Sequence, residues 1–168
     1  MAPRPVHAEP FARGTALTAP FTVRDYVAKQ KSDCLLIGGE PAERPGFVTL
    51  VDLTDDGLVD YVVDLGELDC LDMWPPWRGA HGWWIGIFVA RPDGTAIKAF
   101  EGMTDQVTIE RELGLARVFL GVGGTYCGQD TAGVPFSGMR SCRRPLNWNG
   151  QTNAFEFAPL AEARPRIR

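Results

Sequence analysis

Side-chain alternation with a period of two is the feature that most constrains what this chain can fold into. The segment GFVTLVDL at 46–53 alternates in this way, and LVDYVVDL at 58–65 sets Asp60 and Asp64 against an apolar side. Successive side chains of a β-strand point to opposite faces, so this period predicts strands with one buried face. Between the two segments lies Asp55-Asp56-Gly57, and glycine tolerates the positive φ of a tight turn. The two segments are therefore predicted to form an antiparallel hairpin.

The same pattern occurs twice more. Pro92-Asp93-Gly94 joins GWWIGIFVAR to TAIKAFEG, and Asn149-Gly150 joins RPLNW to TNAFEFA. Both connections are typical of hairpin turns, and ARVFLGVG at 116–123 is a further strand candidate. Roughly seven or eight short strands with little helix predict a mainly β fold. We expect an antiparallel β-sandwich or barrel with one or two short helices and extended N- and C-terminal arms.

Three other segments are less regular. Thr22, with Asp25 three positions later, is typical of a helix start and predicts a helix over about 23–31. CLLIGG at 34–39 predicts a buried strand that stops at its two glycines. TDQVTIERELG at 104–114 fits either a short capped helix or a strand, and the helix is preferred.

The length of 168 residues fits one domain. We predict an extended, proline-rich arm over 1–21, a single β-rich domain over 22–160 and a basic tail over 161–168. An ordered tail needs a surface to lie on, and a neighbouring subunit would supply one.

The charge of the chain is unevenly distributed. The net charge is −4, which removes non-specific attraction to nucleic acid. Acids dominate 40–72 and arginines dominate 139–168, so these segments could attract each other within one copy or between copies. Two solvated faces are the preferred interpretation. Because no secretory or membrane-spanning apolar run is found, we expect no signal peptide, no membrane contact, and a location in the cytoplasm or in an assembled particle.

The four cysteines, Cys34, Cys70, Cys127 and Cys142, form no C-x-x-C pair, which argues against a zinc ribbon. Cys127 and Cys142 flank a loop and could be bridged. Buried free thiols are the preferred interpretation, because a reducing compartment is expected. The sequence leaves the choice open.

The stretch WPPWRGAHGWW at 74–84 holds four of the five tryptophans. Tryptophan clustered with arginine and proline is typical of interface anchors and aromatic ligand sites, and equally of a small core. Trp83 and Trp84 are adjacent in a predicted strand, so one faces the core and the other faces outward. The candidate ligand or interface residues are Trp74, Trp77, Arg78, His81, Trp83 and Trp84.

Candidate catalytic groups are few. His7 lies in the predicted arm, so His81 is the histidine of the predicted domain. Paired with Cys127 or Ser137, His81 would form a hydrolytic dyad. No recognisable nucleophile motif surrounds either residue. His81 is therefore a weak catalytic candidate, and a protein without catalytic activity is the preferred interpretation.

Two charged clusters and a glycine-rich segment complete the candidates. The weak metal candidates are Glu67, Asp69 and Asp72, whose spacing is also that of a half-exposed strand. The anion or salt-bridge candidates are Arg140, Arg143 and Arg144. GVGGTYCG at 121–128 is followed by loop residues instead of a helix, so it does not predict a nucleotide site. No cofactor or metal is expected.

The preferred function is a non-catalytic assembly subunit of a multi-subunit particle, for example a virion capsid, decoration or tail protein. Its partners would be other copies of itself or other subunits. One alternative is a small β-barrel that binds an apolar or aromatic small molecule, with or without enzymatic activity. Another is an immunity-type inhibitor whose acidic face binds a basic partner protein.

Overall fold

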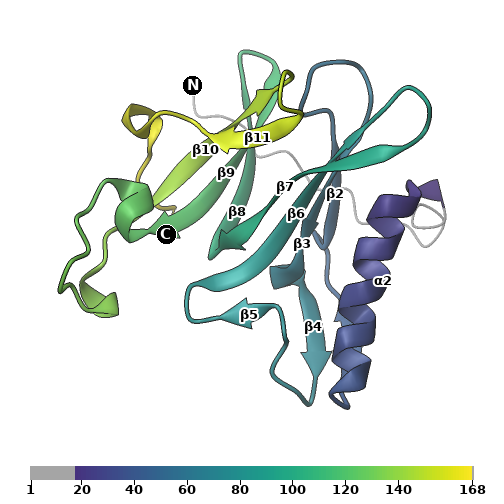
Figure 1. The fold of residues 1–168 in the computed structure, drawn as a ribbon, viewed down its shortest axis with the longest axis horizontal. Coiled ribbons are helices and arrows are strands. Elements are labelled where there is room, and N and C mark those ends of the chain that lie inside the picture. Colours follow the sequence, from purple (N-terminus) through teal and green to yellow (C-terminus); the bar gives the residue numbers. More distant parts are fainter. Residues whose placement is uncertain (1–17, 168) are drawn as a thin grey trace.

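A computed structural model describes residues 18–167 of the chain, and it is mainly β, as predicted (Figure 1). It contains one long helix, two larger antiparallel sheets and a two-stranded ribbon. The helix is α2 (Phe21–Leu36), and the strands are β1 (Glu40–Glu43), β2 (Val48–Val51), β3 (Asp60–Asp64), β4 (Leu68–Leu71), β5 (Arg78–Gly79), β6 (Gly82–Ala90), β7 (Ala96–Thr104), β8 (Gln106–Glu112), β9 (Leu115–Gly123), β10 (Ser141–Asn149) and β11 (Ala154–Phe157). Short 3-10 turns are η1 (Leu65–Glu67), η2 (Gly124–Cys127), η3 (Phe136–Gly138) and η4 (Leu160–Glu162).

The first sheet is built around β6. Strands β3 and β5 pair with one edge of β6, β7 pairs with the other edge, and β2 extends the sheet beyond β3. The hairpin predicted around Asp55-Asp56-Gly57 is confirmed, since β2 and β3 pair with Val51 opposite Asp60. The hairpin around Pro92-Asp93-Gly94 is confirmed as β6–β7.

The second sheet has the order β11-β10-β9-β8. It confirms the strand at 116–123 and the hairpin predicted at Asn149-Gly150. The helix preferred for 104–114 is wrong, because β8 pairs along its whole length with β9. Val107 and Ile109 of β8 pack against the core, and Glu110 is buried on the other side.

The main core lies between the two sheets. Val62, Ile85 and Ile87 of the first sheet belong to the same buried cluster as Val118 and Leu120 of the second. Each fully buried side chain of this size contributes roughly 1.5–3 kcal/mol. This layered packing fits the predicted sandwich or barrel-like fold.

Helix α2 covers the opposite face of the first sheet (Figure 1). It begins earlier and ends later than the predicted helix, and CLLIGG forms its last turn and exit instead of a strand. Val23, Tyr26 and Cys34 are the buried residues of this helix, and the Tyr26 ring lies 5.2 Å from that of Phe88. Thr22 is not the cap: its hydroxyl donates to the carbonyl of Ala96. Tertiary burial of one helical face has therefore overridden the local signals.

All four cysteines are in disulfides, Cys34 with Cys70 and Cys127 with Cys142, so the preference for free thiols is wrong. The first bond joins the end of α2 to β4, and the second joins η2 to β10. Disulfides persist in oxidising compartments and are rare in the cytosol. The preference for free thiols followed from an expected reducing compartment, and the two disulfides argue against that expectation. Within residues 18–167, no helix is long and apolar enough to cross a membrane.

The C-terminal tail lies on its own chain. The backbones of Arg164 and Arg143 exchange two hydrogen bonds of 2.9 and 2.8 Å, which adds a short antiparallel bridge beside β10. Arg164 also forms ion pairs with Glu110 and Glu112, and Arg166 forms one with Asp105. The tail therefore needs no neighbouring subunit to hold it. Most of the predicted N-terminal arm, residues 1–17, lies outside the described residues.

Candidate functional site

A cleft of about 810 Å³ opens where the β5–β6 loop and the end of β7 meet the loops that join β9 to β10. Segments far apart in the sequence contribute to its walls. The lining residues include Ala80, His81, Gly82, Trp84, Glu101, Gly102, Met103, Asp105, Gly121, Val122, Gly123, Gly124, Thr125, Tyr126, Thr131, Phe136, Met139, Arg140, Ser141 and Arg166.

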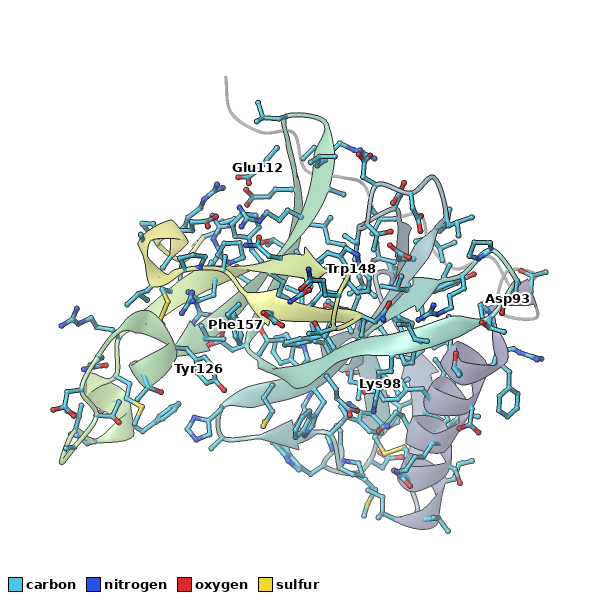
Figure 2. All side chains as sticks on the ribbon, turned by 45° about the horizontal axis from the view of Figure 1, so that its top comes forward. Asp93, Lys98, Glu112, Tyr126, Trp148 and Phe157 are labelled. Atoms are coloured by element: carbon cyan, nitrogen blue, oxygen red, sulfur yellow. A yellow bond between two sulfur atoms is a disulfide. The ribbon has the colours of Figure 1, made fainter. Side chains whose placement is uncertain are left out.

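Aromatic rings form the walls of this cleft. The His81 ring meets Phe136 edge-on, with 5.1 Å between the ring centroids. Trp84 is 40 % exposed and stands opposite Met103 in the β6–β7 pair. Tyr126 contributes a further exposed ring, whose centroid lies 5.1 Å from that of the Phe157 ring (Figure 2). The cleft thus offers several partly exposed planar surfaces, to which an apolar or aromatic group can bind.

The floor of the cleft is formed in part by glycine. A Cβ at Gly121 would lie 2.2 Å from a carboxylate oxygen of Asp105, so only glycine leaves room for that side chain. The backbone N–H of Asp105 donates to the Gly121 carbonyl, and its carboxylate pairs with Arg166 at 2.7 Å. The glycine-rich segment at 121–128 therefore serves close packing at the cleft floor.

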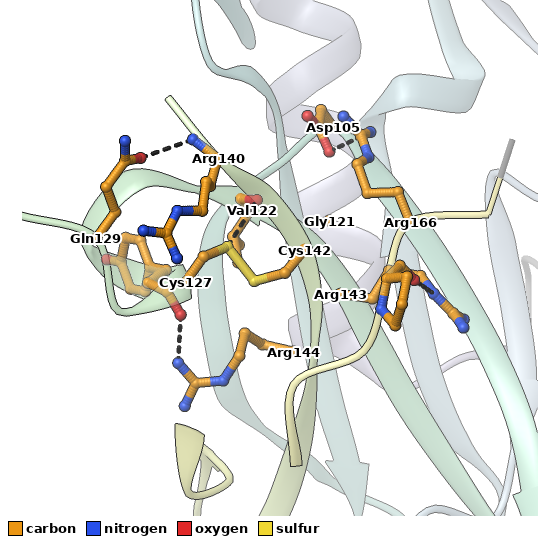
Figure 3. The surroundings of a disulfide bond; sticks show 12 residues. Asp105, Gly121, Val122, Cys127, Gln129, Arg140, Cys142, Arg143, Arg144 and Arg166 are labelled. Atoms are coloured by element: carbon orange, nitrogen blue, oxygen red, sulfur yellow. Dashed lines mark hydrogen bonds and ion pairs between the residues drawn. A yellow bond between two sulfur atoms is a disulfide. The ribbon is translucent and has the colours of Figure 1, made fainter. Parts of the chain in front are cut away.

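Arg140 stands at the side of the cleft formed by the β9–β10 connection (Figure 3). Its backbone N–H donates to the side-chain oxygen of Gln129 at 2.6 Å, and its carbonyl accepts from Gly124 at 2.9 Å. The disulfide between Cys127 and Cys142 lies beside it. The backbone at Arg140 is thus held at several points.

Arg143 and Arg144 do not reach this cleft. Arg143 is buried and pairs with Glu110, and it also donates to the carbonyl of Pro165. Arg144 donates to the carbonyls of Tyr126 and Ala158. Both guanidinium groups therefore hold the second sheet, the η2 turn and the tail together. No ion pair found in residues 18–167 joins the acidic segment 40–72 to the basic segment 139–168.

The first half of the tryptophan stretch lies elsewhere. Trp77 is buried, and its Nε1–H donates to the carbonyl of Leu68. Arg78 donates to the carbonyl of Gly66 and lies 3.7 Å from the Asp69 carboxylate. Trp74 is exposed in the loop between β4 and β5, and the end of β4 lies beside the end of α2 (Figure 1). We call the exposed residues of this end the apolar tip: Leu35, Leu36, Ile37, Leu71, Met73 and Trp74.

Trp83 faces the opposite way from Trp84, as its place in the strand predicts. It packs against both buried clusters, and its Nε1–H donates to Asp64 at 2.5 Å. A Cβ at Gly66 would overlap the Trp83 ring, so this glycine is required for the contact. Trp83 therefore has a structural role beneath the cleft region.

The buried carboxyl of Asp64 is expected to make the free energy of unfolding depend on pH. Burial raises the pKa of this carboxyl from 3.8 to about 6, although hydrogen bonds from Gly66 and Trp83 oppose the shift. The folded chain then binds a proton that the unfolded chain releases, so the free energy of unfolding falls as the pH rises from about 4 to 6, by up to about 3 kcal/mol. Urea denaturation at pH 4, 5, 6 and 7 checks this. Asp64→Asn should show a smaller fall over that range, and an unchanged fall would contradict the assignment.

The weak metal candidates are engaged in other contacts. Glu67 and Asp69 both pair with Arg44, and Asp72 is exposed in a turn with a φ of 65°. Across the described part of the chain, no group of three His, Cys, Asp or Glu side chains could hold a metal ion. The Glu67 and Asp69 carboxylates therefore stabilise the β1–β4 ribbon through Arg44.

The proposed hydrolytic pair of His81 with Cys127 is excluded, because the Cys127 sulfur is in a disulfide and is not a free thiol. His81 instead contacts Phe136, the residue before Ser137. Within residues 18–167, no hydrogen bond joins His81 to Ser137. The arrangement can bind a planar group, and no hydrogen bond found in residues 18–167 pairs His81 with a nucleophile.

The sequence identified His81, Trp84 and Arg140, and the structure brings these three together. It missed Tyr126, Phe136, Asp105 and Arg166. No local pattern marks them, since each belongs to a loop or strand end whose position depends on the packing of the two sheets. Comparisons with protein-family models, with curated proteins and with solved structures found no match for this chain.

Proposed function

We propose that this protein binds a small organic molecule with a planar, apolar part in the cleft between the two sheets. The observation that carries the proposal is the convergence of His81 and Trp84 with Tyr126 and Phe136 around one cavity. Its volume of about 810 Å³ lies within the usual range for small-molecule sites. The ligand class is that of one alternative left open by the sequence, a β-barrel that binds an apolar or aromatic small molecule, but the cleft lies at strand ends instead of inside a barrel.

A disulfide and a strand pair hold parts of the backbone of the site. The Cys127–Cys142 disulfide ties the loop that carries Tyr126 to β10. The β6–β7 pair fixes the backbone of Trp84 opposite Met103. A site that is already ordered pays less conformational entropy on binding.

The proposal is for binding without covalent chemistry. His81 has no free thiol near it, because Cys127 is bonded to Cys142. A general base needs a nucleophile or a substrate proton within hydrogen-bond reach. The aromatic walls instead favour recognition by contact and stacking.

A neutral aromatic probe tests this proposal. With 2-naphthol and ¹⁵N-labelled protein, we expect NMR shift changes at His81, Trp84 and Tyr126 and saturable binding. Trp84→Ala should weaken binding by roughly fivefold or more, because an aromatic contact contributes about 0.5–1.5 kcal/mol beyond its buried area. Trp74→Ala, which removes an equally large exposed ring at the apolar tip, is the control and should bind as the wild type does. Shift changes scattered away from the cleft, or equal affinity in both variants, would refute the proposal.

The assembly role and the inhibitor role stay predictions. Either role would need an exposed contact surface, and the apolar tip is the clearest one on the described chain. The support expected from the C-terminal tail is missing, because the tail lies on its own chain.

A further inference from the structure

We propose that the ligand of this cleft is a planar aromatic monoanion, such as an aryl carboxylate, whose charged group binds the Arg140 guanidinium. This inference rests on the proposed function, because it names the class of molecule that the same cleft takes. It adds a charge requirement that aromatic walls alone do not impose.

In the described part of the chain, the charged side chains that line the cleft are paired, with the exception of Arg140. Asp105 is neutralised by Arg166 at 2.7 Å, and Glu101 is neutralised by Lys98 at 2.5 Å. The Arg140 guanidinium forms no ion pair or hydrogen bond with any residue in 18–167, although its backbone forms two hydrogen bonds. The lining therefore has one uncompensated arginine, in a chain whose net charge is −4.

Hydrogen bonds and a disulfide hold the backbone around Arg140. The side chain of Gln129 accepts from the Arg140 N–H and donates to the carbonyl of Gly138, so it bridges the two arms of the loop. The disulfide at Cys142 fixes the chain two residues further on (Figure 3). The held backbone places the base of the Arg140 side chain at the cleft, and the planar fork of its guanidinium fits a carboxylate with two parallel hydrogen bonds.

The size of the charge favours a monoanion. A single guanidinium balances one negative charge, whereas a phosphate monoester carries nearly two at neutral pH. The other charged groups of the described lining are already paired, so no second cation is free to balance that second charge. An aryl carboxylate satisfies Arg140 and leaves its ring for Trp84, Tyr126 and Phe136.

Two probes of the same shape separate this inference from the proposed function. We would measure the affinities of 2-naphthoate and neutral 2-naphthamide by NMR titration, for the wild type, for Arg140→Gln, and for Arg24→Gln. The last variant removes the same charge from an exposed position on α2. We expect the wild type and Arg24→Gln to prefer naphthoate by about tenfold, and Arg140→Gln to bind both probes equally. Arg140→Lys should keep part of the preference.

The outcomes are distinguishable. Equal binding of the two probes by the wild type, with shift changes in the cleft, would overturn the anion requirement and leave the cleft as a site for neutral aromatics. A preference that survives in Arg140→Gln would also overturn it. Failure of both probes to shift any cleft residue would overturn the proposed function itself. Because Arg140 is exposed, each variant should keep the wild-type melting temperature, which checks that folding is unchanged.

Discussion

Replacing Glu110 with alanine is expected to lower the free energy of unfolding by about 3–5 kcal/mol. Glu110 pairs with both Arg143 and Arg164, and the side chains of Glu110 and Arg143 are only 11 % and 9 % exposed. Both guanidinium groups also lie over the buried ring of Phe119, at 5.4 and 4.5 Å from its centroid. Removing the carboxylate leaves a buried positive charge without its partner, which costs much more than losing an exposed pair. Urea denaturation of the two proteins measures the difference.

The same variant should release the C-terminal tail, since Glu110 binds Arg164 within it. Limited proteolysis within the tail, on the C-terminal side of Ala163, should then proceed faster than in the wild type. Asp33→Asn, which removes the exposed pair with Lys29 on α2, is the control and should change the free energy of unfolding by less than about 1 kcal/mol. A loss below about 1 kcal/mol in Glu110→Ala would show that the cluster contributes little.

The second large effect is expected from the disulfide between Cys34 and Cys70. Its loop spans 36 residues, so replacing both cysteines with alanine should cost about 4 kcal/mol by the loop-entropy relation. The bond joins the end of α2 to β4 of the β1–β4 ribbon, and an ion pair between Lys31 and Glu43 also joins the helix to β1. Thermal and urea denaturation measure the loss. A reducing agent opens both disulfides of the wild type, so it should lower the free energy of unfolding by at least as much.

The pair Cys127 and Cys142 provides the comparison. Its loop spans 15 residues, so its removal should cost less, about 3 kcal/mol. It should, however, weaken 2-naphthol binding, which the loss of the Cys34–Cys70 bond should leave unchanged in the folded protein. If the two double variants had the same effect on probe affinity, the disulfide would have no role in holding the cleft.

The hairpins were predictable because their causes are local. The alternation of apolar and polar side chains shows which residues of a strand face the core. The turn residues at 55–57, 92–94 and 149–150 connect neighbouring strands into antiparallel pairs. The two errors have different causes. The strand at 106–112 forms a tight hairpin with β9, but its turn places Leu113 at a φ of 52°, and leucine gives no turn signal there. The helix at 21–36 is decided by the sheet face that it covers, and the strands of that face are far away in the sequence.

The sequence by itself therefore determined a mainly β chain, three of its hairpins, the opposite orientations of Trp83 and Trp84, and a short set of side chains suited to binding. Only the tertiary structure decided which of those side chains meet. His81 and Arg140 are separated by 59 positions, yet both line one cleft, whereas Trp77, three residues from Trp74, is buried. Periodicity fixes the direction of a side chain within its own strand. The distance between strand ends depends on how two sheets pack, and no short stretch of residues encodes that distance.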